Sequence, residues 1–264
     1  MMWRLMKTEF KKLKRFHILL VGLIGMAFPA ILAVFTQAVV MEEAKVQNFN
    51  FAALINSSMW NGVTIFMPVI FTLIGGEMIN REYKDNTLKS LLPVPVTFRR
   101  LVSGKLLAMG LISIMFGFYS FVITVIVGLL TGVPGLEIPV LFTGLVQMLG
   151  IAICTYISVL PVIAFTSNLP GAFMGGVVFS FLVGYCAMFI KNTLGRSLYP
   201  MLAGLNLIGF DTKVFMNTKE PSIPALSFLS LAVMLLLTIG IVFLTNPPQR
   251  ATKEVKHKKS MFQR

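Results

Sequence analysis

The sequence is short of charge, histidine and cysteine, and each shortage excludes a class of function. Charged residues make up only 12% of the 264 residues, and the one formal charge between Lys105 and Lys191 is Glu137. With 56% hydrophobic residues and a mean hydropathy of +0.83, the chain has too little polar surface to solvate a water-soluble globule. The composition predicts an all-α polytopic protein embedded in a lipid bilayer.

The apolar segments also lack the groups that intramembrane chemistry needs. His17 and His257 fall at span edges, so no His/Asp/Glu cluster can form a metal site or a catalytic pair. Cys154 and Cys186 lie in apolar runs and are interpreted as small hydrophobes rather than a disulfide. There is no G-x-x-x-x-G-K-[ST] loop. We therefore expect no catalytic residue, metal or bound cofactor, and any energy must come from a separate protein.

Six apolar runs are long enough to cross a bilayer, whose core needs roughly 20 residues per helix. The first run follows a basic start, as a secretion signal does, but it exceeds the about 7 to 15 residues of a signal core and lacks a clear cleavage pattern. We interpret it as a retained span, and the chain as a single transmembrane domain. The predicted spans are 18–40, 57–76, 101–131, 138–165, 171–190 and 224–244.

The positions of lysine and arginine predict the orientation. Eighteen of the 23 basic residues occur before the first span, between the second and third, or after the last. Cytoplasmic loops retain Lys and Arg, so both termini are expected in the cytoplasm. The net charge of +13 does not predict nucleic-acid binding, because the cations lie at span boundaries rather than along one face with interleaved aromatics.

The basic start has the pattern of an interfacial helix. Between residues 2 and 15, apolar residues recur at steps of three and four, and lysines occupy the other faces. Such a helix docks a cytoplasmic partner, or it only anchors the first span in the headgroups. The apolar positions are Trp3, Met6, Phe10 and Leu13.

The loop from Glu77 to Lys105 is the cytoplasmic loop with both signs of charge, so we expect it to be structured. Asn86 or Thr87 can cap a short helix that Pro93 and Pro95 terminate. The helix offers an apolar knob to a soluble protein, or it lies along the headgroups. Its apolar face consists of Leu88, Leu91 and Leu92.

Two further features concern packing. The loop 191–221 is too apolar to be solvated, so we predict short helices that re-enter the outer leaflet or cap the bundle, with a simple interfacial helix as the alternative. Leu198 and Leu207 are among the loop residues that we expect to be buried.

Small residues at G-x-x-x-G spacing predict close approach between helices. These pairs are Gly128 with Gly132 and Gly171 with Gly175.

The stretch from Gly75 to Val96 resembles the permease subunits of type-2 ABC exporters. That family shows an acidic residue, an E-x-x-x-x-T-L-K-x-L-L stretch, a proline-bounded turn and a G-K opening of the third span. Here Glu77 is the acidic residue, residues 82–92 form the charged stretch, and Gly104 and Lys105 open the span. The layout of the whole chain agrees, and permeases of this size resemble those of bacitracin and lantibiotic self-protection.

The resemblance implies a coupling helix at about 81–92 in a cleft of a separate cytoplasmic ATPase, which would hold ATP and Mg. The first amphipathic helix would lie against the same ATPase. Two permeases, identical or homologous, would join two ATPases, with outer re-entrant helices at 191–221. The implied coupling residues are Arg81, Glu82, Tyr83, Lys84, Asp85, Leu88, Leu91 and Leu92.

These observations predict a non-enzymatic permease subunit in a bacterial cell membrane. It would expel an amphipathic substrate, such as an antimicrobial peptide, a drug or a lipid. One alternative is a non-transporting membrane module that senses antimicrobial peptides or assists assembly. A vitamin-uptake energising module is another, but its Arg-bearing cytoplasmic helices are not found in this sequence.

Overall fold

The computed structural model describes residues 17–44, 49–84, 98–166, 171–210, 215 and 223–245, and these residues form helices and turns without strands. The prediction of an all-α polytopic membrane protein is confirmed, because five of the described helices are long and apolar enough to cross a membrane and a sixth is shorter. The elements are α2 (His17–Ala44), α3 (Phe51–Asn61), η1 (Gly62–Phe66), α4 (Met67–Lys84), α6 (Phe98–Leu130), α7 (Ile138–Thr166), α8 (Phe173–Cys186), η2 (Ala187–Phe189), α9 (Thr193–Leu198), α10 (Pro200–Leu207) and α12 (Pro224–Leu244).

The second span is longer than the sequence predicted. Helix α3, the π-helical turn η1 and α4 follow one another without a break, and the apolar part of this unit runs from Phe51 to Arg81. The predicted limits, 57–76, followed the charge-free run, but Glu77 and Arg81 lie within α4. Arg81 to Lys84 therefore continue the second span rather than starting a separate helix.

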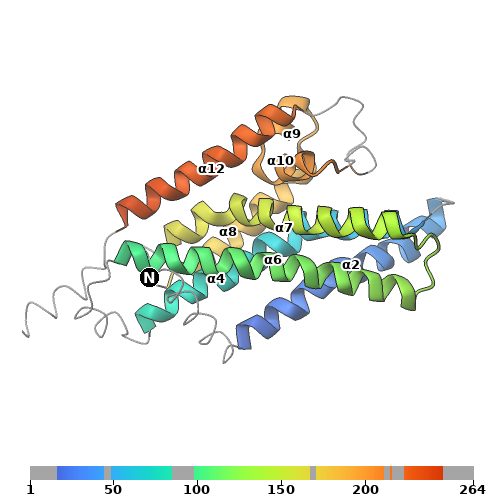
Figure 1. The fold of residues 1–264 in the computed structure, drawn as a ribbon, viewed down its shortest axis with the longest axis horizontal. Helices are drawn as coiled ribbons and strands as arrows, with labels where there is room; N and C mark the ends of the chain where they lie inside the picture. Colours follow the sequence, from blue (N-terminus) through green and yellow to red (C-terminus); the bar gives the residue numbers. More distant parts are fainter. Residues whose placement is uncertain are drawn as a thin grey trace, which may run out of the picture.

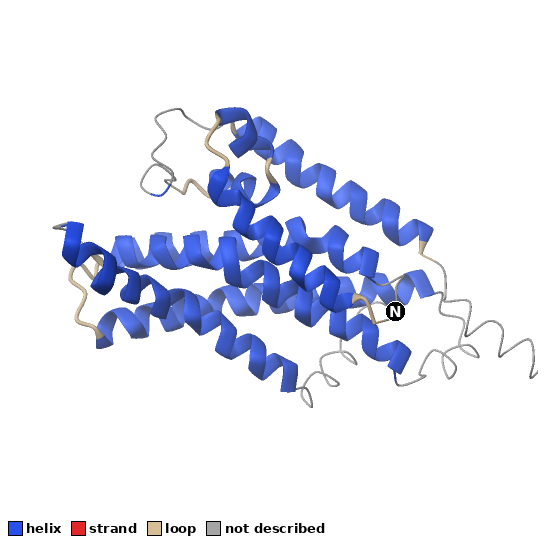
Figure 2. Ribbon diagram, turned by 180° about the vertical axis from the view of Figure 1, so that it is seen from behind, coloured by secondary structure: helices blue, strands red, loops and turns tan. Residues whose placement is uncertain are grey.

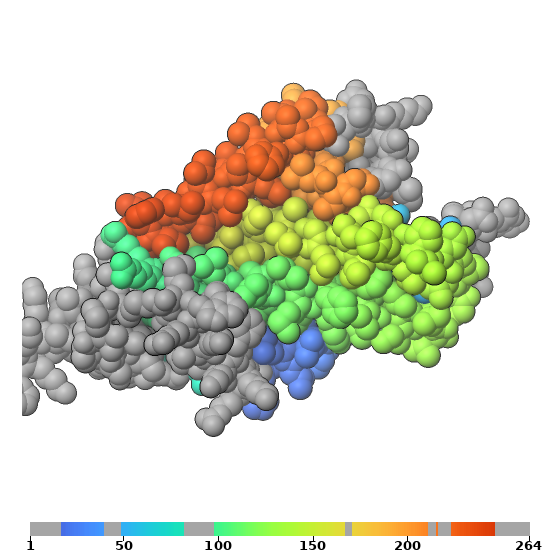
Figure 3. Space-filling model, viewed as in Figure 1, coloured from blue at the N-terminus to red at the C-terminus, as the bar shows by residue number. Residues whose placement is uncertain are grey.

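The helices alternate in direction and form an elongated bundle (Figures 1 and 2). The end of α4, the start of α6 and the end of α12 lie at one end of the molecule, on the left of Figure 1, and α2 begins in the same half of the molecule, at the bottom of the picture. We call this end the basic end, because the cation-rich segments of the sequence adjoin it. Helix α12 lies to one side, on α7 and α10, and Figure 3 shows it along the outside of the bundle.

The long central unit α3–η1–α4 forms the core. In its most apolar stretch of 18 residues, 72% of the residues are buried, whereas the corresponding stretches of α2 and α12 are 28% and 22% buried. Phe71 of α4 packs edge-on against Tyr156 of α7 and in tilted contact with Phe116 of α6. The exposed side chains of the outer helices include Leu20, Phe35 and Leu236, which fits surfaces that face lipid.

The π-helical turn permits a close helix contact. Pro68 has no backbone N–H, so the carbonyl of Thr64 lacks the donor that residue i+4 supplies in an α-helix. Gly184 of α8 lies against this carbonyl, and a Cβ at Gly184 would be 2.6 Å from the Thr64 oxygen and 3.0 Å from Pro68 Cγ. A glycine is required here for α8 to approach the irregular part of the second span.

Hydroxyl pairs connect the central unit to its neighbours. Ser58 Oγ of α3 lies 2.9 Å from Thr124 Oγ1 of α6, and these two hydroxyls share a hydrogen bond. Thr72 Oγ1 donates to Ser180 Oγ of α8 over 2.8 Å. All four side chains are buried. Such hydrogen bonds fix the register of neighbouring helices in an apolar environment, because side-chain shape alone distinguishes only weakly between one register and another.

The G-x-x-x-G prediction requires correction. Gly128 does lie in close contact with Phe51 and Leu54, as a packing glycine should. Gly132 and Gly171, however, lie outside the helices with φ of +68° and +84°, so they serve turns. A Cβ added at Gly175 would have no described atom within 4 Å, whereas the adjacent Gly176 approaches Thr166 and Thr72.

The described part of the outer loop consists of two short helices that pack on the bundle. Met201, Leu202 and Leu205 of α10 are buried, but Leu198 and Leu207 are exposed, contrary to the expectation from composition. Tyr199 Oη donates to the Val183 carbonyl over 2.5 Å. Burial, with a contribution from Cys186, raises the pKa of Tyr199 to about 12, so this donor stays protonated at neutral pH.

Candidate functional site

The candidate site is the base of the charged loop, where α4 ends and α6 begins. Both helix ends lie at the basic end of the molecule (Figure 1). Any force applied to the loop reaches the membrane helices through these two ends, so their attachment decides what the force can move. The side chains that attach them to the rest of the bundle include Lys105, Asn80 and Arg99.

Lys105 joins α6 to α4. Its side chain is only 4% exposed, and Nζ donates to the Met78 carbonyl over 2.9 Å. A carbonyl oxygen has two lone pairs, so Met78 can accept this bond and also the α-helical bond from residue 82. A buried ammonium is costly without such a partner. Lys105 is therefore a fixed connection between two helices rather than a solvated loop cation.

Asn80 joins α4 to the turn before α8. It is 5% exposed, its Oδ1 accepts from the Gly171 backbone N–H over 3.1 Å, and its Nδ2 donates to Glu77 Oε2 over 3.3 Å. Gly171 has a positive φ of +84°, a conformation that other residues adopt at a cost. The amide thus bridges two segments that are far apart in the sequence.

Arg99 joins the start of α6 to the end of α12. Its Nε donates to the Thr245 carbonyl over 3.3 Å, and the Ser103 hydroxyl donates to the Arg99 carbonyl over 2.9 Å. A carbonyl at the end of a helix lacks a helical donor and is therefore a natural acceptor for a cation. Together with Lys105 and Asn80, Arg99 links α4, α6, α8 and α12 at the basic end.

Replacing Asn80 with leucine is expected to destabilise the protein. The Gly171 N–H would lose its side-chain acceptor, and a hydrogen bond of this kind contributes about 0.5–1.5 kcal/mol to stability. Asn80→Asp retains an acceptor but places a carboxylate beside Glu77, so it should restore stability only in part. Thermal unfolding in detergent should give the highest midpoint for wild type, a lower one for Asn80→Asp and the lowest for Asn80→Leu. Equal midpoints for all three would contradict the assigned bridge.

The predicted site residues divide between described and undescribed parts of the chain. Arg81 lies in α4 and is partly buried, and the backbone of Glu82, Tyr83 and Lys84 completes that helix. Residues that lie outside the described part are Trp3, Met6, Phe10, Leu13, Asp85, Leu88, Leu91 and Leu92.

Sequence reasoning assigned no bridging role to Asn80, Lys105 or Arg99. Charge alone places Lys105 among the loop cations, since it does not show that a side chain turns inward. The sequence signal for a buried role of Lys105 was its position at the start of a long apolar run, where a cation lies either at the membrane surface or beside a partner. Asn80 carries no charge pattern, so the sequence held no comparable signal for it.

The fold and the site define a polytopic membrane protein whose helices are connected at the base of a charged loop. The family described as ABC-2 family transporter protein matches residues 5–187, more than half of the chain. The chain therefore belongs to the ABC-2 transporter family.

A curated relative is the bacitracin transport permease protein BCRB of Bacillus licheniformis. It is 29% identical over 135 residues, which are 51% of this chain and 64% of that protein. The chain thus matches less than two thirds of the length of this relative.

Proposed function

We propose that the chain is the permease subunit of an ATP-driven exporter, moved by separate ATPase subunits that bind ATP and Mg. Membership of the ABC-2 family and the similarity to a bacitracin transport permease support this proposal. The sequence has no phosphate-binding G-x-x-x-x-G-K-[ST] loop of its own. The observation that carries the proposal is the match of residues 5–187 to the ABC-2 transporter family, and the bond between Lys105 and Met78 joins the helices on both sides of the charged loop.

In this mechanism the loop between α4 and α6 is the contact with the ATPase. Closure of two ATPases on ATP would push the loop, and the connected helices would respond as a rigid body rather than as separate segments. Leu88, Leu91 and Leu92 would provide the apolar contact. The charged residues at 81–85 would fix its register by ion pairs across the interface.

The proposed assembly contains two permeases, identical or homologous, and two ATPases in a bacterial cell membrane. Both termini would lie on the cytoplasmic side, as the distribution of lysine and arginine predicts. The helix at 2–15 would contact the same ATPase. The substrate would be amphipathic, such as an antimicrobial peptide, and would enter from the membrane, which accords with the bacitracin permease among the relatives.

The decisive experiment compares two aspartate substitutions in the loop. Leu91→Asp puts a charge on the proposed apolar face, whereas Ser90→Asp puts the same charge on another face of the same short helix. We expect Leu91→Asp to abolish co-purification of the ATPase and to lower transport at least tenfold. Ser90→Asp should retain both.

The measurement is ATPase recovery with the tagged chain, followed by ATP-dependent substrate export from vesicles. Equal behaviour of the two variants would refute the assigned coupling face. Full resistance of cells to an antimicrobial peptide in the absence of any ATPase partner would refute the proposed exporter function and favour the sensor function.

A further inference from the structure

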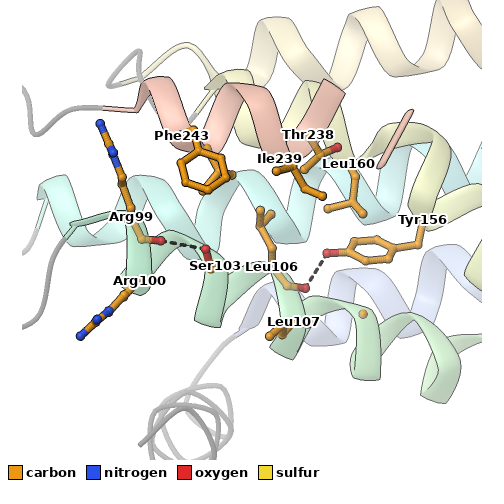
Figure 4. Close-up of a pocket in the computed structure, with 12 residues that line it drawn as sticks. Arg99, Arg100, Ser103, Leu106, Leu107, Tyr156, Leu160, Thr238, Ile239 and Phe243 are labelled. Atoms are coloured by element: carbon orange, nitrogen blue, oxygen red, sulfur yellow. Dashed lines mark hydrogen bonds between the residues drawn. The ribbon is translucent and has the colours of Figure 1, made fainter. Parts of the chain in front are cut away.

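A groove between α6, α7 and α12 opens at the basic end of the molecule. Its volume is about 560 Å³, within the range of about 300–1,000 Å³ that is usual for ligand pockets. Figure 4 shows Arg99 and Arg100 at its mouth and Tyr156 at its inner end. Of the three bridging side chains only Arg99 lines the groove, at its mouth, so the inner space can take a separate occupant.

The inner part of the groove is suited to a hydrocarbon chain. Leu106, Leu160 and Val242 line it, and its two buried hydroxyls are already bonded to backbone carbonyls. Tyr156 Oη donates to Leu106 over 2.5 Å, and Thr238 Oγ1 donates to Met234 over 2.8 Å. Because these donors already have acceptors, the walls of the groove need no polar ligand to satisfy them.

The mouth is cationic. Arg99 and Arg100 are exposed, and among the described residues that line the groove none is acidic. The bond from Arg99 Nε to the Thr245 carbonyl directs this guanidinium toward α12, whereas Arg100 extends the other way (Figure 4). The positive end of the α6 dipole lies at the same place and favours an anion there.

The length of the groove matches one leaflet. Arg99 and Gly110 mark its two ends on α6, and the eleven residue-to-residue steps between them rise about 16 Å along an α-helix. Half of a bilayer core of about 30 Å is about 15 Å. The rim side chains Leu107, Ile239 and Phe243 are 49%, 51% and 66% exposed, so the groove is open sideways toward lipid.

We propose that the groove binds an anionic phospholipid from the leaflet at the basic end, with the headgroup phosphate at the Arg99 guanidinium, the charge of the adjacent Arg100 adding to the positive field, and one acyl chain along α6 and α12. Arginine suits phosphate because its planar guanidinium donates two parallel hydrogen bonds. Basic pockets between membrane helices are established sites for such headgroups, and anionic lipid is abundant in the cytoplasmic leaflet. A bound lipid would also fill the wedge between α6 and α12.

The test uses the purified full chain, without ATPase, so its outcome is independent of the proposed transport function. Native mass spectrometry would compare phosphatidylglycerol and phosphatidylcholine with identical acyl chains. We expect the anionic lipid to bind at least tenfold more tightly. The double variant R99Q/R100Q should abolish this preference, and Lys191→Gln, which removes an exposed cation elsewhere, should retain it.

A second pair of variants tests the acyl-chain part of the groove. Ile239→Trp fills the groove without changing the arginines, so both lipids should bind about tenfold more weakly. Leu236→Trp, on the exposed face of α12 outside the groove, should bind as wild type does. Equal binding of the two lipids by wild type, a preference retained in R99Q/R100Q, or lipid binding by Ile239→Trp as tight as that of wild type would each overturn the proposal.

Discussion

Replacement of Gly184 with alanine is expected to lower the stability of the protein more than alanine at either of the other glycines of α8, Gly175 and Gly176. The new Cβ would lie 2.6 Å from the Thr64 oxygen and 3.2 Å from its carbon, both of which are backbone atoms. Backbone cannot rotate away as a side-chain tip can, so α8 must move off η1. Overpacking of this kind costs about 1–3 kcal/mol.

Gly175 provides the matched control, because it lies on the same helix and no described atom is near the place that a Cβ would take there. Gly175→Ala should be neutral or slightly stabilising, since alanine is favoured over glycine in a helix by about 1 kcal/mol. The measurement is the temperature at which half of the detergent-purified protein loses its monodisperse peak. The same midpoint for both variants would show that the contact between α8 and η1 is not tight.

Lys105→Met is expected to uncouple ATP hydrolysis from transport. Methionine has a similar length and fits a buried site, but it cannot donate to the Met78 carbonyl, and a hydrogen bond from a charged donor contributes about 1.5–3 kcal/mol. The two helices at the base of the loop would then move separately. We expect the transport-to-hydrolysis ratio to fall about tenfold while the ATPase still co-purifies.

Lys191→Met is the control for loss of a cation, because Lys191 is exposed. This variant should keep the wild-type ratio and thermal stability. If Lys105→Met transports as much substrate per ATP as wild type, the bond between α6 and α4 does not transmit the movement. Loss of ATPase binding instead of coupling would assign Lys105 to the interface itself.

Several limits of the fold could be predicted from hydropathy alone. The last span matches its prediction at 224–244, and α7 ends one residue beyond the predicted 138–165. In both places the apolar run ends where the helix ends. The second span differs because Glu77 and Arg81 stay in the helix, and a charge near a membrane boundary does not by itself terminate helical hydrogen bonding.

The site could be predicted only in part. The mixed charges and the leucine spacing of the loop after the second span identified the segment that joins α4 and α6. The roles of Asn80 and Lys105 depend on partners 91 and 27 residues away along the chain. Such pairings have no local periodicity, so no pattern within one segment could reveal them.

The sequence alone determined that this protein lies in a membrane, that it is helical, and that eighteen of its 23 cations fall in three segments of the chain. These properties follow from composition and spacing, because the bilayer selects continuous apolar helices and retains lysine and arginine on one side. Tertiary structure alone decided which glycines make close contacts, which cation is buried, and where a groove with arginines at its mouth opens between α6 and α12. Those features arise from the packing of distant helices, whose relative positions are set by side-chain shape and buried hydrogen bonds rather than by hydrophobicity.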